Sequence, residues 1–296
     1  GGGGEIAVGG LNNFVWVGSN RLGAAYTFDG GESWKQVQLP DVGTSEDDMT
    51  GFNWAYYLKR HICAADRVKE GTFYLWHGSG TFRSTTGGET WTRLGSVPVE
   101  NGGFNAKMRS VPGQEGHLFA TAGQQDGSAA SPFVRSEDGG FSWTSVDGIS
   151  EVHDFGFGAV TPGANYPAVW VVGYANQAFG ICRSDDNCQS WARVSDGFPL
   201  GSLDPVVAID GDKKVHDRCY IGFNGSGYAY APGGGKASLA PMVIPAYMLI
   251  PAAAAYRFGQ RWSKLKTQHN AFQREMDAMM DATAKRNPAW RTRLEK

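Results

Sequence analysis

Four copies of one eight-residue turn, spaced about 50 residues apart, constrain the fold of this chain more than any other feature. The clearest copy, residues 136–143, reads SEDGGFSW: a hydroxyl, a carboxylate two residues later, glycine and then Trp143. An Asp side chain in such a turn accepts hydrogen bonds from the N–H groups that follow it, and glycine supplies a backbone conformation that a Cβ atom would forbid. The Trp opens the next strand and can bury apolar surface between sheets. The octet therefore predicts a stable hairpin turn, and it does not predict a catalytic role.

The other copies of this octet occupy residues 27–34, 84–91 and 184–191. The second has Thr86 where the carboxylate belongs, and the fourth has Cys188 in place of glycine. A period near 50 residues of strand-type sequence predicts an all-β protein, a β-propeller with one blade per repeat. We expect the octets to be equivalent turns between the third and fourth strands of successive blades. Their structural positions are Asp29, Trp34, Trp91, Asp138, Trp143, Asp186 and Trp191.

The octets resemble Asp-boxes, the structural turns of sialidases, sortilin-like receptors and the xyloglucanases of glycoside hydrolase family 74. Further segments resemble the later blades of that family: residues 71–74, 111–118, 155–158 (FGFG), 162–173 (PGANYPAVWVVG), 180–186, 211–212, 219–222 and 224–227. The resemblance covers residues 5–231 and departs from the family at Thr86, at Cys188 and at Ser226, where the family usually has Arg. It implies a part of the second of two seven-bladed propellers. The family's two catalytic Asp residues, one from each propeller and acting by inversion, would both precede Gly1, so none is assigned here.

The chain divides by composition into three parts. Residues 1–235 are expected to form a partial propeller of about four to five blades, the last of which, residues 205–231, has two strand candidates and no octet. Residues 236–256 form an apolar strap whose three prolines would break a helix, so a transmembrane span is not expected. Residues 257–296 carry apolar positions at heptad spacing and predict a basic amphipathic α-helix. We expect an open arc of blades whose edges other polypeptide covers, with residues 237–286 contacting other protein chains.

The charge distribution and the cysteine pattern indicate which classes of partner and ligand to expect. The net charge is −2, but the segment from Lys236 onward carries 11 basic and four acidic residues, which leaves an acidic body. An acidic body argues against nucleic acid as a partner. The cysteines form no CxxC pair and have no His at zinc spacing, so no metal and no cofactor is expected. Cys182 and Cys188 flank one octet, where a hairpin disulfide and two free buried thiols are both possible. No signal peptide is visible, since Gly1 leads directly into strand-like sequence.

Candidate site residues come from aromatic and acidic positions. Trp54, Tyr56 and Tyr57 follow an acidic loop and are candidates for stacking on sugar rings. Trp76 and Trp170 lie inside strands and are expected to fill the core. Several acids in predicted loops could in principle form a catalytic pair, but solvated loop acids are the commoner case: Asp41, Asp47, Asp48, Asp154 and Asp204. His153 precedes Asp154, and neighbours on a strand face opposite ways.

The leading functional interpretation is a carbohydrate-recognising or structural propeller module of a larger extracellular or virion assembly, of the adhesin or tail-component type, with a polysaccharide or cell-surface glycan as partner. A first alternative is part of a xyloglucan-type endo-β-1,4-glucanase, an inverting glycoside hydrolase whose catalytic Asp pair lies outside this chain. A second is a sortilin-like protein-binding propeller. We expect no β-glucan hydrolysis by this chain alone. Hydrolysis of xyloglucan separates the first two interpretations, and a glycan array separates the first from the third.

Overall fold

The structure is a computed structural model of the chain and describes residues 4–18, 22–45, 60–78, 80–99, 106–123, 132–194, 206–223 and 227–232. The chain divides into two units, Gly1–Met242 and Val243–Lys296, and all described residues belong to the first. The expected strap at 236–256 and the expected helix at 257–296 therefore lie outside the described residues, as does the predicted contact through 237–286. In the parts that are described, no helix has the length and hydropathy of a membrane span.

The described residues form five antiparallel sheets in which successive strands are neighbours. The first sheet holds β1 (Gly4–Val8), β2 (Phe14–Gly18), β3 (Ala24–Thr27) and β4 (Lys35–Gln36). The second holds β5 (Cys63–Ala65), β6 (Phe73–His77), β7 (Gly80–Ser84) and β8 (Thr92–Arg93). The third holds β9 (Lys107–Ser110), β10 (Leu118–Thr121), β11 (Phe133–Ser136) and β12 (Thr144–Ser145). The fourth holds β13 (Ile149–Val160), β14 (Pro167–Ala175), β15 (Ala178–Ser184) and β16 (Ala192–Arg193). The fifth holds β17 (Val206–Gly211), β18 (Arg218–Phe223) and β19 (Tyr228–Pro232).

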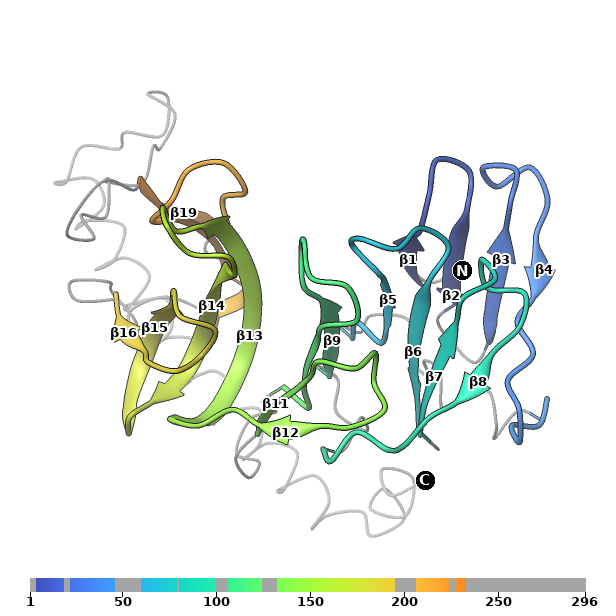
Figure 1. Cartoon of the computed structure of the whole chain (residues 1–296), viewed down its shortest axis with the longest axis horizontal. Coiled ribbons are helices and arrows are strands. Elements are labelled where there is room, and N and C mark those ends of the chain that lie inside the picture. The colour runs from blue at the N-terminus through green and yellow to red at the C-terminus, as the bar shows by residue number, and fades with distance from the viewer. Residues whose placement is uncertain are drawn as a thin grey trace, which may run out of the picture. The chain divides into compact units, whose positions relative to one another are not determined.

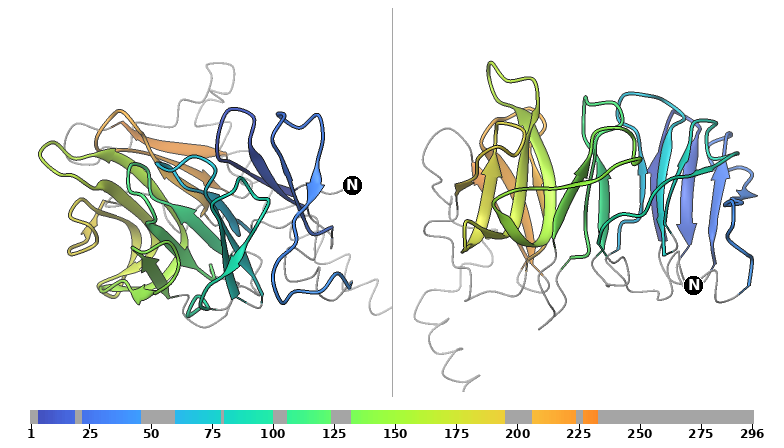
Figure 2. Two further views of the ribbon diagram at one scale, coloured as in Figure 1. Left: turned by 45° about the vertical axis from the view of Figure 1, so that its right-hand side comes forward. Right: turned by 60° about the horizontal axis from the view of Figure 1, so that its bottom comes forward.

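Repeated antiparallel sheets of this kind are propeller blades, and the prediction of a partial, all-β propeller is confirmed (Figures 1 and 2). The last sheet has three described strands and not the two that the sequence suggested. The last of them, β19, ends in proline, a residue that sheets tolerate mainly at edges.

Neighbouring sheets meet at their first strands. His61, just before β5, forms a parallel bridge with Lys107 of β9. Its N–H donates to Ala106 O at 2.9 Å, and its carbonyl accepts from Met108 N at 2.6 Å. In the same way β1 contacts β5, and β13 contacts β17. The first strands therefore lie next to one another, and charged side chains on them can meet across sheets.

Glycine allows a close approach between β13 and β17. A Cβ atom on Gly211 would lie 2.4 Å from the Cα of Gly158 and 2.6 Å from Trp170 Nε1. A Cβ atom on Gly156 would lie 2.5 Å from Ile209 O. Only glycine fits at such distances, so the FGFG segment of β13 sets the spacing between the fourth and fifth sheets.

Alternating strand residues fill the spaces between sheets. Trp76 and Trp170 are 3% and 2% exposed, which confirms that they belong to the core. The solvent exposure of the octet Trp residues depends on whether a neighbouring sheet covers them. Trp91 is 8% exposed and packs with residues of the first sheet, whereas Trp34, in the first sheet itself, is 41% exposed. Burial of the octet Trp is thus complete at Trp91, partial at Trp143 and Trp191, and lost at Trp34, because among the described residues no sheet precedes its own.

All four octets join the third and fourth strands of their sheets, as predicted from their spacing. In the third octet, Asp138 Oδ1 accepts hydrogen bonds from Ser136 Oγ at 2.8 Å and Ser142 N at 2.9 Å, and Oδ2 accepts from Ser142 Oγ at 2.6 Å. Ser136 Oγ in turn accepts from Gly140 N at 2.8 Å. The octets that contain Asp29 and Asp186 repeat this arrangement. Each turn is thus held by its own side chains.

The fourth octet achieves the same turn without glycine. Asn187 and Cys188 adopt φ values of 57° and 65°, in the left-handed region that glycine usually occupies. Cys182 and Cys188 are both buried free thiols, so of the two possibilities left open by the sequence the structure has no disulfide here. Burial raises the pKa of Cys188 to about 12 and also raises that of Cys182. Both thiols are therefore protonated packing groups and poor nucleophiles.

We predict that Asp138→Thr keeps the turn at a cost of about 1 kcal/mol at pH 7. The second octet shows why, because Thr86 Oγ1 replaces one carboxylate oxygen and accepts from Thr90 N at 2.9 Å. Burial alone would raise the pKa of Asp138, but hydrogen bonds from Ser142 and Ser136 outweigh burial and lower that pKa. The contribution of Asp138 is therefore fully present above the unfolded-state pKa of about 3.9 and is lost as the pH falls through the folded-state value. Thermal unfolding at pH 7 and pH 2.5 should show the difference between the two proteins shrinking; a difference independent of pH would contradict the prediction.

Candidate functional site

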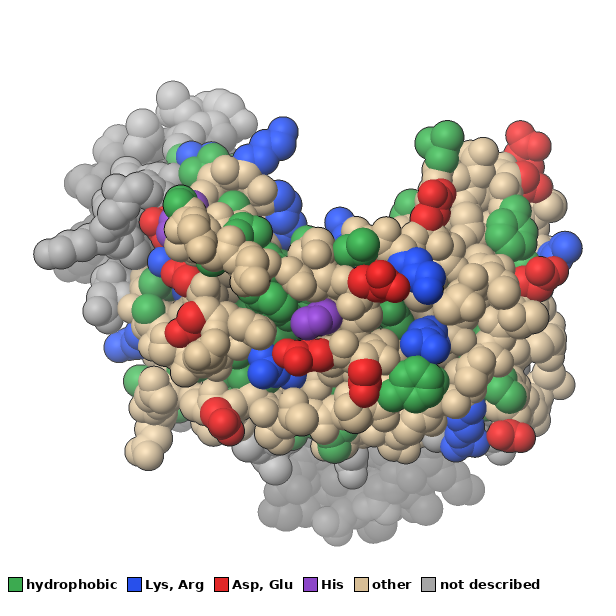
Figure 3. Space-filling model, in the orientation of Figure 1, with side chains coloured by type: hydrophobic (Ala, Val, Ile, Leu, Met, Phe, Trp, Pro, Cys, Tyr) green, Lys and Arg blue, Asp and Glu red, His purple; other side chains and the backbone are tan. Residues whose placement is uncertain are grey.

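A pocket of about 290 Å³ lies among the first strands, and residues from β1, β5, β9, β13 and β17 line it. Its polar lining consists of Glu5, His61, Arg67, Arg109, Ser110, Asp210 and Lys213. Its apolar lining includes Ile6, Val8, Met108 and Phe157. Figure 3 shows the surface hollowed at its upper edge, with basic side chains on one wall of the hollow. The pocket combines both charge signs with few aromatic groups, so it is better suited to polar hydrogen bonding than to ring stacking.

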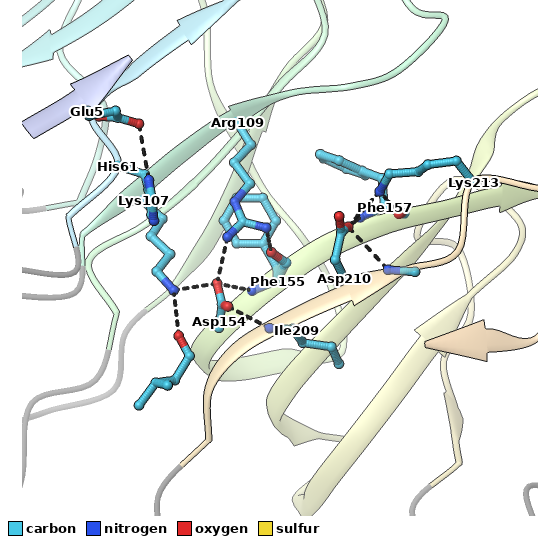
Figure 4. Close-up of polar contacts among 12 residues, drawn as sticks. Glu5, His61, Lys107, Arg109, Asp154, Phe155, Phe157, Ile209, Asp210 and Lys213 are labelled. Atoms are coloured by element: carbon cyan, nitrogen blue, oxygen red, sulfur yellow. Dashed lines mark hydrogen bonds and ion pairs between the residues drawn. The ribbon is translucent and has the colours of Figure 1, made fainter. Parts of the chain in front are cut away.

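Glu5 joins the first sheet to the second at one side of this pocket. Its Oε2 accepts from Ile62 N at 2.7 Å and Cys63 N at 3.1 Å, and its Oε1 lies 3.2 Å from His61 Nδ1 (Figure 4). Donors therefore occupy both oxygens, and the side chain is only 13% exposed. Glu5 serves to hold β1 against β5 at the pocket wall.

Asp210 and Lys213 form the opposite side. Asp210 Oδ1 accepts from Phe157 N at 2.9 Å, Gly211 N at 3.1 Å and Lys213 Nζ at 2.6 Å (Figure 4). Lys213 also donates to the Phe157 carbonyl. Asp210 is about half exposed, so a ligand in the pocket can reach this pair.

Asp154 is the most deeply buried acid of the region, with 0% exposure. Its Oδ1 lies 2.6 Å from Lys107 Nζ and 3.3 Å from Arg109 Nη2 and accepts from Phe155 N at 2.8 Å. Its Oδ2 accepts from Ile209 N at 2.8 Å. Figure 4 shows the two cations and two N–H groups converging on this carboxylate from the third, fourth and fifth sheets. Asp154 is thus a fully paired ion that fastens three sheets together.

The partners of Asp154 are themselves held in place. Arg109 donates to the Phe155 carbonyl, and its guanidinium carbon lies 5.3 Å from the centre of the Phe155 ring. Lys107, 3% exposed, also donates to Val207 O at 3.4 Å. A buried ion pair of this kind is favourable only when every partner is satisfied, and here the carboxylate has donors on both oxygens.

The prediction that Asp154 is a loop acid is wrong: it lies within β13 and is buried. His153 does face the other way, and its Nε2 lies 2.7 Å from Glu151 Oε1. Asp41 is exposed in a turn, and Asp47, Asp48 and Asp204 lie outside the described residues, as do Trp54, Tyr56 and Tyr57. Sequence reasoning missed Lys107 and Arg109, although a Lys on an apolar strand is itself a signal of a buried partner.

Glycoside hydrolysis makes specific demands on carboxyl groups. A general acid requires a raised pKa, and an inverting pair requires two carboxyls roughly 6.5–9.5 Å apart around a water. Every described carboxyl group whose pKa departs from its usual value is shifted downward: Asp29, Asp66, Asp138, Asp186 and Asp212. Among the described residues there is likewise no group of three or more potential metal ligands. The polar side chains that line the pocket can donate and accept hydrogen bonds to a polar ligand.

Comparison with known proteins relates this arrangement to a family. A xyloglucanase from a Paenibacillus species is 31% identical over 239 residues, which cover 79% of this chain and 21% of the relative. A xyloglucanase from Acetivibrio thermocellus is 32% identical over 246 residues, which cover 82% of this chain and 26% of the relative. The solved glycoside hydrolase family 74 enzyme of Niastella koreensis has a TM-score of 0.59 and 26% identity, covering 76% of this chain and 30% of that one. No family model matches the sequence.

These relatives correct the leading functional interpretation. Proteins named as xyloglucanases overturn the adhesin or tail-component interpretation, and they give no support to a virion surface. The adhesin interpretation gave more weight to the length of the chain and to its tail than to the resemblance of the blades. The chain spans between a fifth and about a quarter of the length of these curated relatives. Over its propeller blades, the chain is a xyloglucanase-like fragment of the glycoside hydrolase family 74 type.

Proposed function

We propose that this chain forms part of a xyloglucan-type glycoside hydrolase and contributes blades that bind and position the polysaccharide. The observation that carries the proposal is 31–32% identity to curated xyloglucanases over about four-fifths of the chain. A further element of the proposal, that the acid and base of an inverting hydrolysis lie on polypeptide other than this chain, is supported by the resemblance of these blades to only a part of the family's second propeller. A polysaccharide does not cross a cell membrane, so the proposed substrate implies an extracellular place of action.

We expect purified chain to release no new reducing ends from xyloglucan and yet to be retarded by xyloglucan in affinity gel electrophoresis. Catalysis needs both carboxylates, whereas binding needs only part of the cleft. Hydrolysis by the chain alone that Asp47→Asn abolishes would contradict the assignment of the catalytic pair to other polypeptide. Absence of both hydrolysis and retardation would contradict the proposal that these blades bind xyloglucan.

Trp54, Tyr56 and Tyr57 are our proposed stacking residues. Trp54→Ala should weaken xyloglucan retention by about fivefold, the effect of roughly 1 kcal/mol of lost aromatic contact. Phe141→Ala is the matched control, because Phe141 is an aromatic residue that is 54% exposed and belongs to a structural octet. Equal losses in both variants would show that the effect is not specific to the proposed stacking residue.

A further inference from the structure

The two carboxylates that line the pocket among the first strands, Glu5 and Asp210, are each balanced by a cation. Buried Arg60 interacts electrostatically with Glu5: burial lowers the pKa of Arg60 to about 10 and Glu5 opposes that shift, so the guanidinium stays charged at neutral pH. Asp210 Oδ1 lies 2.6 Å from Lys213 Nζ. Neither carboxylate therefore gives the pocket an unbalanced negative charge.

Two arginines on the pocket wall have no such balance. Arg109 shares the single carboxylate of Asp154 with Lys107, which is the nearer cation at 2.6 Å against 3.3 Å. Arg67 is exposed and, within the part of the chain that the structure describes, makes no hydrogen bond or ion pair. With His61 counted as neutral, the described charges of the lining and their partners are five cations and three carboxylates, an excess of two positive charges in an acidic body: Arg60, Arg67, Lys107, Arg109 and Lys213 against Glu5, Asp154 and Asp210.

The cations of the pocket wall also have N–H groups to spare. Arg109 uses one N–H on each Nη atom for contacts within the protein, which leaves its Nε–H and a second N–H on each Nη (Figure 4). Lys213 donates to two acceptors and keeps a further N–H, and Arg67 keeps its whole guanidinium. A planar guanidinium presents paired N–H groups that match two oxygens of a carboxylate or a phosphate. The unused donors are therefore suited to an oxyanion.

The size and the apolar lining of the pocket define the rest of the ligand. Its volume of about 290 Å³ lies at the lower end of the range of roughly 300–1,000 Å³ for small-molecule sites. Ala7, Met108 and Phe157 add apolar surface, which can contact a carbon skeleton and would strip water from an inorganic ion without replacing it. The pocket therefore fits a small organic molecule that bears oxyanion groups.

We propose that this pocket binds a small organic dianion, a dicarboxylate or a phosphate monoester, between Arg67, Arg109 and Lys213. A dianion neutralises the two excess charges, whereas a neutral sugar leaves them unbalanced. Because xyloglucan carries no charge, this site is additional to the proposed binding of that polysaccharide and does not rest on it.

Isothermal titration calorimetry of the full chain with succinate and with glucose 6-phosphate tests the proposal. Salt at about 50 mM keeps screening weak, with a Debye length above about 10 Å. We expect at least one of the two dianions to bind at a single site with a Kd below about 1 mM, and its neutral counterpart, succinamide or glucose, to bind at least about tenfold more weakly. The tighter dianion identifies the carboxylate or the phosphate as the preferred group. Absence of binding by both dianions, or equal binding by inorganic sulfate or by the neutral counterparts, overturns the proposal.

Arg67→Gln should weaken binding of the tighter dianion by about tenfold, the usual effect of losing charge-assisted hydrogen bonds. Its side chain is exposed and unpaired within the described residues, so thermal unfolding should be unchanged. Lys69→Gln is the matched control, because it removes the same charge nearby from a side chain that is 55% exposed and does not line the pocket. It should weaken binding by less than about twofold.

Equal losses in Arg67→Gln and Lys69→Gln, or undiminished binding in Arg67→Gln, overturn the proposal, because the anion would then respond to the general charge of the surface. Displacement of the dianion by a xyloglucan oligosaccharide also overturns it, since the sugar would occupy the same pocket. Failure of xyloglucan to bind while the dianion binds contradicts the proposed function alone.

Discussion

Asp154→Ala is expected to lower the free energy of unfolding by about 3–5 kcal/mol, the usual cost of removing one partner of a buried ion pair. The variant leaves the Lys107 ammonium 3% exposed without the carboxylate 2.6 Å away. It also removes the acceptor of Phe155 N and Ile209 N, two backbone groups on different sheets. Denaturant unfolding followed by tryptophan fluorescence measures the loss, since Trp170 packs with Ile209 in one cluster.

Two further variants separate the contribution of charge to stability from the contribution of packing. Lys107→Met should cost less than Asp154→Ala, because the carboxylate keeps Arg109 and two N–H donors. The double variant Lys107→Met, Asp154→Leu should recover part of the loss, since replacing a buried ion pair by apolar groups is often nearly neutral. A cost for Asp154→Ala below about 1 kcal/mol would show that water reaches the cluster and that it does not fasten the sheets.

Asp66→Asn is expected to lower the free energy of unfolding by about 3 kcal/mol at pH 7, within the range for removing charge-assisted hydrogen bonds from a buried group. The carboxylate is 6% exposed and accepts four hydrogen bonds, from Val68 N, Lys69 N, Tyr74 Oη and, in the following sheet, Gly116 N. An amide turns one acceptor into a donor that faces Tyr74 Oη and Gly116 N.

Asp212→Asn should cost less, because the Asp212 carboxylate accepts from Lys214 N, Val215 N and Tyr220 Oη, with Arg218 Nη1 3.6 Å away, and these groups all belong to its own sheet. Equal costs for the two variants would contradict the role of Asp66 in joining two sheets.

The loss of stability in Asp66→Asn should depend on pH. Burial acts to raise the pKa of Asp66, but the N–H groups of Lys69, Gly116 and Val68 and the Tyr74 hydroxyl outweigh it, so the pKa is lowered. Stability from a group with a depressed pKa is fully present above the unfolded-state value of about 3.9 and is lost as the pH falls below it. The difference between the parent protein and Asp66→Asn should therefore be constant from pH 5 to 8 and shrink below about pH 4. A difference that grows on acidification would mean that another group is titrating.

Resemblance over propeller blades and catalytic activity depend on different residues. The resemblance of the blades to a hydrolase family is carried by strand and turn residues, whereas the catalytic carboxylates of a glycosidase are a few side chains on loops. A chain can therefore be similar to its relatives over blades and contain none of their reacting groups. Relatives named as xyloglucanases favour the hydrolase interpretation.

The sequence by itself determined the local elements. In the third octet the hydroxyl, the carboxylate and the glycines lie within five residues, so their spacing alone specified the turn and its place between the third and fourth strands. The burial of Trp76 and Trp170 followed from alternation along apolar strands. The length of the repeat then specified blades, because each sheet is built from consecutive strands.

Only the tertiary structure decided what happens between sheets. Asp154 and Lys107 are 47 positions apart and Asp66 and Gly116 are 50 apart, and no local pattern states which first strand will lie beside which. The same octet position is buried as Trp91 and exposed as Trp34, because burial depends on whether a neighbouring sheet is present and not on the turn. Side-chain alternation determines which face of a strand is apolar, whereas the packing of one blade on another determines which charges meet across that face.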